Sequence, residues 1–450
     1  MILPDQPLLE FFARAGGGGS SGGGSSGGSG GGGLVSLLIF IGYVPSQWVG
    51  SLFRKGNQVL LGSLLLWPMA FVSLIAFSWL MGIYGFLIAC GVIAGTGSGL
   101  YGWLGKAIKR SKKIGLKLQT AEKSDPAWDE ATLLEATSKT FYKFQTDWMN
   151  SDSDSIKTYT TPAYFYHTSL MLHALKLAGR KNMMEAVRID SQNITSLNDA
   201  EGVRGDSVTV GFKASAVDSL IETATGATLY TDTSSFIEYW TFLRDEDGWK
   251  LDHIDQATAS YSAVSSELRD FALTNNYCFS LDWGWLLLPK RGQLFAKGKF
   301  GTSDINNHII GNYKESLVQL YTYQPNPNAD VSGMKYYLIA QANVQKTYGN
   351  IVVRRKKFLQ GGIRDLQKVE TEWTSFNKNY EVFASSSEGA TSFELLEPTF
   401  MEKLNALSFE VNIEVVDNVV YLYSQEKKIN PAHYPEMLAI LHEAYTYMKR

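Results

Sequence analysis

The chain has 450 residues, 45% of them hydrophobic, and carries 41 Lys and Arg against 44 Asp and Glu. The length predicts two or three domains, because single hydrophobic cores stop growing at about 250–300 residues. Residues 1–126 hold 10 basic and 4 acidic residues (net +6), 127–260 hold 11 and 20 (net −9), and 261–450 hold 20 and 20. This distribution argues against a nucleic-acid binder, which needs its basic patch on a folded domain.

The cysteines and histidines predict no metal centre and no cofactor. Cys90 and Cys278 lie far apart in the sequence and cannot build a disulfide framework or a cysteine-based zinc site. The six histidines are scattered without a ligand spacing. No nucleophile motif or phosphate-binding loop accompanies them, so we do not expect an enzyme.

Residues 1–33 are predicted to be flexible, since 16–33 are almost entirely Gly and Ser. The tripeptide at 13–15, Ala-Arg-Ala, has the small-x-small form of a signal-peptidase site. The segment before it lacks the basic residues with which a signal peptide begins, and it carries Asp5 and Glu10. Two interpretations stay open: a remnant of a signal region that begins upstream, or a chance match.

Residues 34–105 are predicted to be a transmembrane region, because the run from Gln58 onward contains no charged residue. About 20 apolar residues suffice for a helix to cross a bilayer. Two such helices would form a hairpin over 58–104, with a glycine-containing turn at 81–85. The stretch 34–53, broken by Pro45, either crosses as an extra helix or lies re-entrant at the interface.

Basic residues flank this region on both sides, at Arg54 and Lys55 and again in 106–126. The positive-inside rule then predicts a multi-pass protein of the cell membrane with the bulk of the chain in the cytoplasm. Residues 106–126 form a basic tether. Its side chains nearest the apolar run are expected to contact lipid headgroups of the bilayer: Lys106, Lys109, Arg110, Lys112 and Lys113.

The segment 127–260 shows helices first and strands afterwards. Apolar residues recur at three- and four-residue steps over 129–149, and Thr161-Pro162 opens a second helix. From about residue 185 apolar and polar residues alternate, and 244–248 is a hairpin turn signal. The order predicts an α+β domain in which an antiparallel sheet cups the helices.

Three features make this segment resemble the Tim44-like domain, a branch of the cystatin/NTF2-like cone fold. They are the aromatic helix Phe141-Tyr-Lys-Phe144 running into Trp148, the turn Tyr159-Thr-Thr-Pro162, and the ending Glu238–Gln256 with its tryptophans, leucine and isoleucine. The upstream Gly/Ser tract and apolar run are similar to bacterial members. The resemblance implies adaptor work at a membrane, as in the mitochondrial relative, which tethers import machinery and a chaperone. This chain lacks an obvious upstream chaperone-binding region, so a direct import role is not expected.

We therefore expect a membrane-anchored adaptor that binds a protein or a basic peptide at the cytoplasmic membrane face, because a net −9 attracts basic segments. The alternative is a small-molecule or lipid binding module that uses the pocket of the cone. The candidates to line such a pocket are Phe141, Phe144, Tyr164, Tyr166, Trp240 and Trp249. If the domain has no pocket, the same side chains form ordinary core. His253 beside Asp252 and Asp255 is interpreted as a satisfied or exposed histidine rather than a catalytic base.

Residues 261–450 are predicted to form a second α+β domain without an assigned role. A helix is expected at 265–276, strands at 317–323 and 335–344, and a closing helix after Asn430-Pro431. Alternating apolar residues over 409–424, on both sides of Asp417-Asn418, predict a hairpin there. The partner and the oligomeric state stay open.

Overall fold

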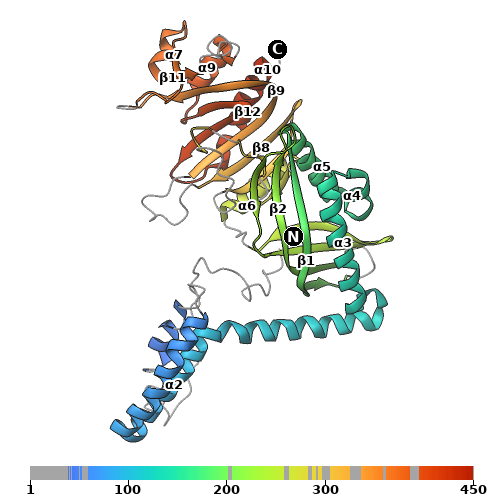
Figure 1. Cartoon of the computed structure of the whole chain (residues 1–450), viewed down its shortest axis with the longest axis vertical. Coiled ribbons are helices and arrows are strands. Elements are labelled where there is room, and N and C mark those ends of the chain that lie inside the picture. Colours follow the sequence, from blue (N-terminus) through green and yellow to red (C-terminus); the bar gives the residue numbers. More distant parts are fainter. Residues whose placement is uncertain are drawn as a thin grey trace. The chain divides into compact units, whose positions relative to one another are not determined.

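The structure is a computed structural model of the chain (Figure 1). It describes residues 39, 41, 43–49, 51–52, 59–200, 205–257, 263–281, 286–289, 292–295, 305–324, 336–357, 361–385 and 395–448. The predicted flexible segment 1–33 and its signal-peptidase-like tripeptide lie outside these residues. The chain divides into two compact units, one of Met1–Glu130 with Thr195–Leu197, the other of Ala131–Ile194 with Asn198–Arg450.

The first unit is built around helix α2 (Val59–Ser124), which is followed by the short 3-10 helix η2 (Pro126–Trp128). Gly82 interrupts α2 with a non-helical backbone conformation, φ 58° and ψ −135°. Glycine reaches positive φ at little cost because it has no Cβ. Helix α2 is thus two helices joined at Gly82, and its second half continues through the basic residues that were predicted to be a tether.

The structure corrects the prediction of transmembrane helices. In the part of the chain that it describes, no helix is at once long enough and apolar enough to cross a membrane. The prediction rested on the absence of charge, but a crossing also needs sustained apolar character over about 20 residues. The predicted hairpin at 58–104 and the multi-pass membrane localisation are therefore wrong. The stretch 34–53, for which crossing and re-entry were both left open, lies only in part within the described residues.

Three helices open the second unit: α3 (Glu130–Asn150), α4 (Ser153–Tyr159) and α5 (Pro162–Leu177). The side chain of Thr161 caps α5 by accepting a hydrogen bond from the Tyr164 backbone N–H at 3.3 Å. Helix α4 was not predicted, because 150–154 has the composition of a loop. Asp152 starts it by accepting from the Ser155 backbone N–H at 3.0 Å.

The helices lie against a five-stranded antiparallel sheet (Figure 1). Its strands are β1 (Arg180–Asn198), β2 (Ser207–Glu222), β3 (Thr228–Asp232), β4 (Phe236–Asp245) and β5 (Gly248–Gln256). The order is β1-β2-β4-β5, with β3 paired to β2. The predicted hairpin is the β4–β5 pair, in which Asp245 lies opposite Gly248. The alternation predicted on β2 places Val208, Val210 and Phe212 in the core. An α+β domain at this position is confirmed.

The C-terminal domain contains a seven-stranded sheet of order β10-β11-β9-β8-β7-β6, with β12 paired to β9. Its strands are β6 (Cys278–Ser280), β7 (Ile305–Tyr313), β8 (Ser316–Tyr323), β9 (Tyr336–Arg355), β10 (Gln367–Val369), β11 (Tyr380–Ala384) and β12 (Asn412–Glu426). Its helices are α6 (Ala263–Thr274), α7 (Thr374–Asn379), α9 (Pro398–Ala406), η5 (Pro431–His433) and α10 (Tyr434–Met448). One apolar cluster joins α10 to the sheet through Met437, Leu441 and Met448.

The hairpin predicted around Asp417-Asn418 is wrong. Strand β12 runs unbroken from Asn412 to Glu426 and pairs along the length of β9. Asp417 has a φ of 55°, and the register shifts on both sides of it. A β-bulge inserts one residue and bends a strand without reversing it. The turn-like pair therefore marks a bulge, which local composition does not distinguish from a two-residue turn.

A buried carboxylate holds a short loop onto β12. The backbone N–H of Gln293 donates to both carboxylate oxygens of Glu414, at 2.8 and 2.9 Å, and the Tyr421 hydroxyl donates to Oε2. The loop approaches so closely because it carries Gly292, with a φ of 140°. A Cβ there would collide with the Tyr421 hydroxyl and lie 3.1 Å from Glu414 Oε1.

Replacing Gly292 with alanine should therefore lower the free energy of unfolding by about 1–3 kcal/mol, the usual effect of overpacking a core. Equilibrium urea denaturation of the full chain measures it. Gly361→Ala is the matched control, because a Cβ there meets nothing within 4 Å, and it should change stability by less than about 0.5 kcal/mol. Equal stabilities of the two variants would contradict the close approach.

Candidate functional site

The interior of the first α+β domain is filled by aromatic side chains. Trp240 is fully buried, and its ring centroid lies 4.9 Å from that of Phe141, 5.4 Å from Phe144 and 5.7 Å from Phe212. Tyr164 is also buried and packs against Phe144 at 6.2 Å. Four of the six pocket-lining candidates thus contact one another as core between α3, α5 and the sheet.

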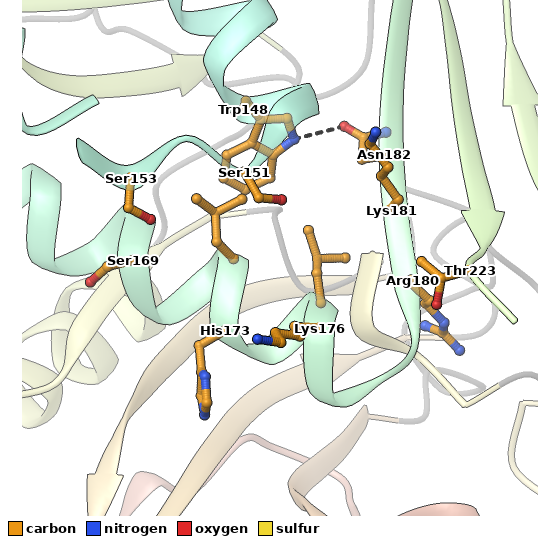
Figure 2. Close-up of a pocket in the computed structure, with 12 residues that line it drawn as sticks. Trp148, Ser151, Ser153, Ser169, His173, Lys176, Arg180, Lys181, Asn182 and Thr223 are labelled. Carbon is orange, nitrogen blue, oxygen red and sulfur yellow. Dashed lines mark hydrogen bonds between the residues drawn. The ribbon is translucent and has the colours of Figure 1, made fainter. Parts of the chain in front are cut away.

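The other two candidates lie elsewhere. Tyr166 is 42% exposed on α5, and Trp249 is half-buried at the start of β5, where the Arg244 guanidinium lies 5.9 Å from its ring centroid. None of the six lines the hollow at the ends of α3 and α5 that Figure 2 shows.

A satisfied carboxylate sits among the core aromatics. Glu238 accepts from the Trp240 indole N–H at 2.9 Å and from Gln256 Nε2 at 2.5 Å. Burial raises the pKa of Glu238, while these two donors act in the opposite direction. The oxygens are held by an indole and an amide, groups that do not ionise near neutral pH, so this arrangement supports packing.

His253 lies on β5 with its Nε2 3.0 Å from Asp255 Oδ1. Asp252 instead accepts from the Thr161 hydroxyl at 2.8 Å, so the three side chains do not converge. Within the described residues, no three His, Cys, Asp or Glu side chains gather as metal ligands.

A hollow in this domain lies where the ends of α3 and α5 meet α4 and the start of β1. It has a volume of about 470 Å³. Figure 2 shows α5 along one side of it and the strand that carries Lys181 and Asn182 along the other. The lining residues are Trp148, Ser151, Ser153, Ser169, Leu172, His173, Leu175, Lys176, Arg180, Lys181, Asn182 and Thr223.

The pocket has an apolar floor and a polar rim. Trp148, Leu172 and Leu175 are buried, whereas the rim residues His173 and Lys176 are exposed. The floor is positioned by a hydrogen bond from the Trp148 indole N–H to Asn182 Oδ1, at 3.0 Å, drawn in Figure 2. This bond ties the end of α3 to β1 and fixes the width of the hollow.

A hydrogen-bond network fixes helix α4 beside the pocket. Asp147 near the end of α3 accepts from the Ser155 hydroxyl at 2.6 Å and from the Tyr159 hydroxyl at 3.0 Å. Lys143 donates to the same carboxylate at 3.1 Å. Because both Ser155 and Tyr159 belong to α4, the network holds this short helix on α3 and so places Ser151 and Ser153 at the rim.

The lining is positively charged and contains no carboxylate. Lys176, Arg180 and Lys181 all contribute. Burial lowers the pKa of the Arg180 guanidinium to about 10, so it stays protonated at neutral pH. Asn182 also donates to Asp218, a partly buried acid outside the lining, at 2.5 Å. Burial raises the pKa of that carboxyl to about 6.

Sequence reasoning did not find this pocket. Its lining comes from α3, α4, α5, β1 and Thr223 after β2, and no motif joins these segments. The nearest signal was the turn segment 150–154, in which Ser151 adopts a φ of 56°. This segment interrupts the helical spacing of apolar residues, and nothing in it indicated helix α4, which closes one side.

The predicted lipid-contact residues lie on α2. Lys112 and Lys113 are exposed. Lys106, Lys109 and Arg110 belong to the same helix, but their side chains lie outside the described part of the chain. Their contact with lipid headgroups stays a prediction.

Two families match parts of the chain. Residues 115–256 match the Tim44-like domain, and residues 337–430 match a protein family of unknown function, DUF3137. No curated protein sequence matches the chain.

Two solved structures are similar to parts of the chain. The mycobacterial trehalose monomycolate transport factor A, TtfA, has a TM-score of 0.31 at 9% identity, covering 42% of this chain and 96% of its own. The intermembrane space region of the chloroplast protein ARC6 has a TM-score of 0.21 at 13% identity, covering 27% and 94%. Likeness at this level says nothing about ligands or partners.

Proposed function

With residues 115–256 forming a Tim44-like domain, we propose that the chain is an adaptor that binds a polypeptide partner, not an enzyme, and that the partner docks at the pocket of Figure 2. One observation carries the proposal: the interior of the cone is filled by Phe141, Phe144 and Trp240, while a hollow of about 470 Å³ opens beside it. A ligand would therefore bind at the pocket rather than inside the cone.

The composition of the pocket suits a polypeptide. Peptide and protein interfaces combine an apolar centre with a polar rim. Here Trp148, Leu172 and Leu175 supply the centre, and exposed side chains of α5 and the 151–153 segment supply the rim. Tryptophan is enriched among the residues that dominate binding energy at such interfaces.

The volume favours a second candidate, a small molecule or lipid, because ligand pockets commonly measure about 300–1,000 Å³. A small molecule would be retained by the purified chain and detected as added mass by native mass spectrometry. If the ligand is a polypeptide, the purified chain should show only its own mass and should bind presented peptides.

Filling the pocket should abolish peptide binding. Ser169 lies half-buried in the lining, so Ser169→Trp would occupy the space that a partner side chain needs and weaken binding on the order of 10-fold or more. The measurement is binding of the full chain to an array of twelve-residue peptides covering varied compositions.

Ala163→Trp is the matched control, since Ala163 is exposed on the same helix and does not line the pocket. It should leave peptide binding unchanged. The proposal is overturned if no peptide binds above background, or if Ser169→Trp and Ala163→Trp bind equally.

A further inference from the structure

We propose that the pocket recognises an anionic side chain of the partner, a carboxylate or a phosphate, next to an apolar residue. The inference rests on the proposed function and specifies its ligand. The anionic ligand differs from the basic partner that the net charge of residues 127–260 led us to expect.

Two ammonium groups at the pocket are available to a ligand. Lys176 is exposed at the end of α5, and Lys181 is half-buried on β1. Within the part of the chain that the structure describes, neither ammonium group makes a hydrogen bond or an ion pair. A third positive charge lies behind them on Arg180, whose Nη1 donates to the Leu286 carbonyl at 2.9 Å. Three basic side chains thus belong to one lining, and the carboxylate of Asp417 acts on the guanidinium of Arg180.

Within the described residues, Lys176 and Lys181 make no ion pair with the acids that adjoin the lining in sequence, which are Asp147, Asp152, Asp154 and Glu222. Asp152 is used as the cap of α4, and Asp218 is held by Asn182 on the far side of that amide. The net −9 of residues 127–260 is an average over the domain, whereas a ligand within the pocket responds mainly to charges within about 8–10 Å. The ammonium groups of Lys176 and Lys181 therefore bear more on what binds than the average charge of the domain does.

Hydroxyl groups complete an anion-binding lining. Ser169 and Thr223 already donate to the backbone carbonyls of Tyr166 and Gly179, at 2.8 and 3.0 Å. Ser151 and Ser153 lie at the opposite side, on the segment that leads into α4. Among the described residues, their hydroxyl groups make no hydrogen bond, so both can donate to a ligand oxygen. Hydrogen bonds to an ionised acceptor are about twice as strong as neutral ones.

The apolar floor supplies the second half of the recognition. Trp148, Leu172 and Leu175 are buried beneath the cationic rim. A free inorganic anion would leave this surface uncovered, whereas a peptide with an acidic residue beside a leucine or an aromatic residue would cover it. The geometry therefore favours a polypeptide source of the anion.

The test compares four peptides of equal length that differ at one central position. That position holds glutamate, phosphoserine, glutamine or lysine, and the residue next to it is leucine in all four. Isothermal titration with the full chain should give binding to the glutamate or phosphoserine peptide at least about 10-fold tighter than to the glutamine peptide, weakening as salt is raised. Free glutamate and inorganic phosphate serve as separate arms and should bind more weakly than either peptide.

The variant is Lys176→Glu/Lys181→Glu, which should remove the preference for anionic peptides. Lys427→Glu/Lys428→Glu carries the same change in net charge at exposed positions of the C-terminal domain and should keep it. Circular dichroism melts establish that both variants fold.

Equal binding of the glutamate and glutamine peptides, or tightest binding of the lysine peptide, would overturn the anionic assignment. The proposed polypeptide binding would still stand if that binding is lost in Ser169→Trp. Absence of binding by all four peptides, together with a negative peptide array, would overturn both.

Discussion

Trp240→Ala should lower the free energy of unfolding of the Tim44-like domain by about 3–5 kcal/mol, the range for removing a buried large aromatic side chain. The indole packs against Phe141, Phe144 and Phe212, so its loss leaves a cavity bordered by three rings from two layers. It also removes the hydrogen bond to Glu238 and leaves that buried carboxylate with one donor fewer.

Hydrogen exchange of the full chain, read on peptides from β2 and β4, measures this loss where it occurs. Protection of these amides should fall, whereas peptides from β9 and β12 in the other sheet should exchange as in the wild type. Tyr166→Ala is the control, because Tyr166 is 42% exposed, and it should change stability by less than about 0.5 kcal/mol. Similar losses in the two variants would show that the aromatics do not form the packed core described.

Glu414→Gln should remove a pH dependence from the stability of the C-terminal domain. Burial raises the pKa of Glu414 from an ordinary 4.5 to about 7, although the Tyr421 hydroxyl and the backbone N–H groups of Gln293 and Leu294 favour the charged form. The folded state then binds a proton more tightly than the unfolded state. The contribution of this group to stability is fully present below pH 4.5 and is lost as pH rises towards 7.

The rise of the Glu414 pKa from 4.5 to about 7 corresponds to about 3 kcal/mol, at roughly 1.4 kcal/mol per pKa unit. The difference in unfolding free energy, wild type minus Glu414→Gln, should therefore fall by about that amount between pH 4.5 and pH 7. Urea denaturation at several pH values measures it, and taking the difference cancels the titration of all other groups. Parallel curves for the two proteins would contradict the raised pKa.

Features that depend on residues close together in the sequence were predictable. The spacing of Phe141, Phe144 and Trp148 indicated the face of α3 that is buried, and Thr161-Pro162 marked the start of α5. The turn before Gly248 indicated the β4–β5 hairpin. In each case the cause is local, namely helical periodicity, capping or glycine at positive φ.

Errors arose where a local pattern has two outcomes. Asp417 at positive φ suits a hairpin turn as well as a bulge, and only pairing with β9 shows that the strand continues. The uncharged run after Gln58 suggested membrane crossing, but absence of charge does not establish the sustained apolar character that a crossing needs.

By itself, the sequence determined that residues 127–260 form a helices-then-strands domain, since helical periodicity and strand alternation are properties of contiguous residues. Its aromatic segments carried the resemblance to the Tim44-like domain, which the family match bears out. The tertiary structure decided what that domain offers to a partner. Packing placed Trp240 and Phe141 in a filled core and brought Lys176, Lys181 and Ser151 to one hollow. The physical reason is that a pocket and its local charge depend on which distant side chains become neighbours, and neither composition nor net charge contains that information.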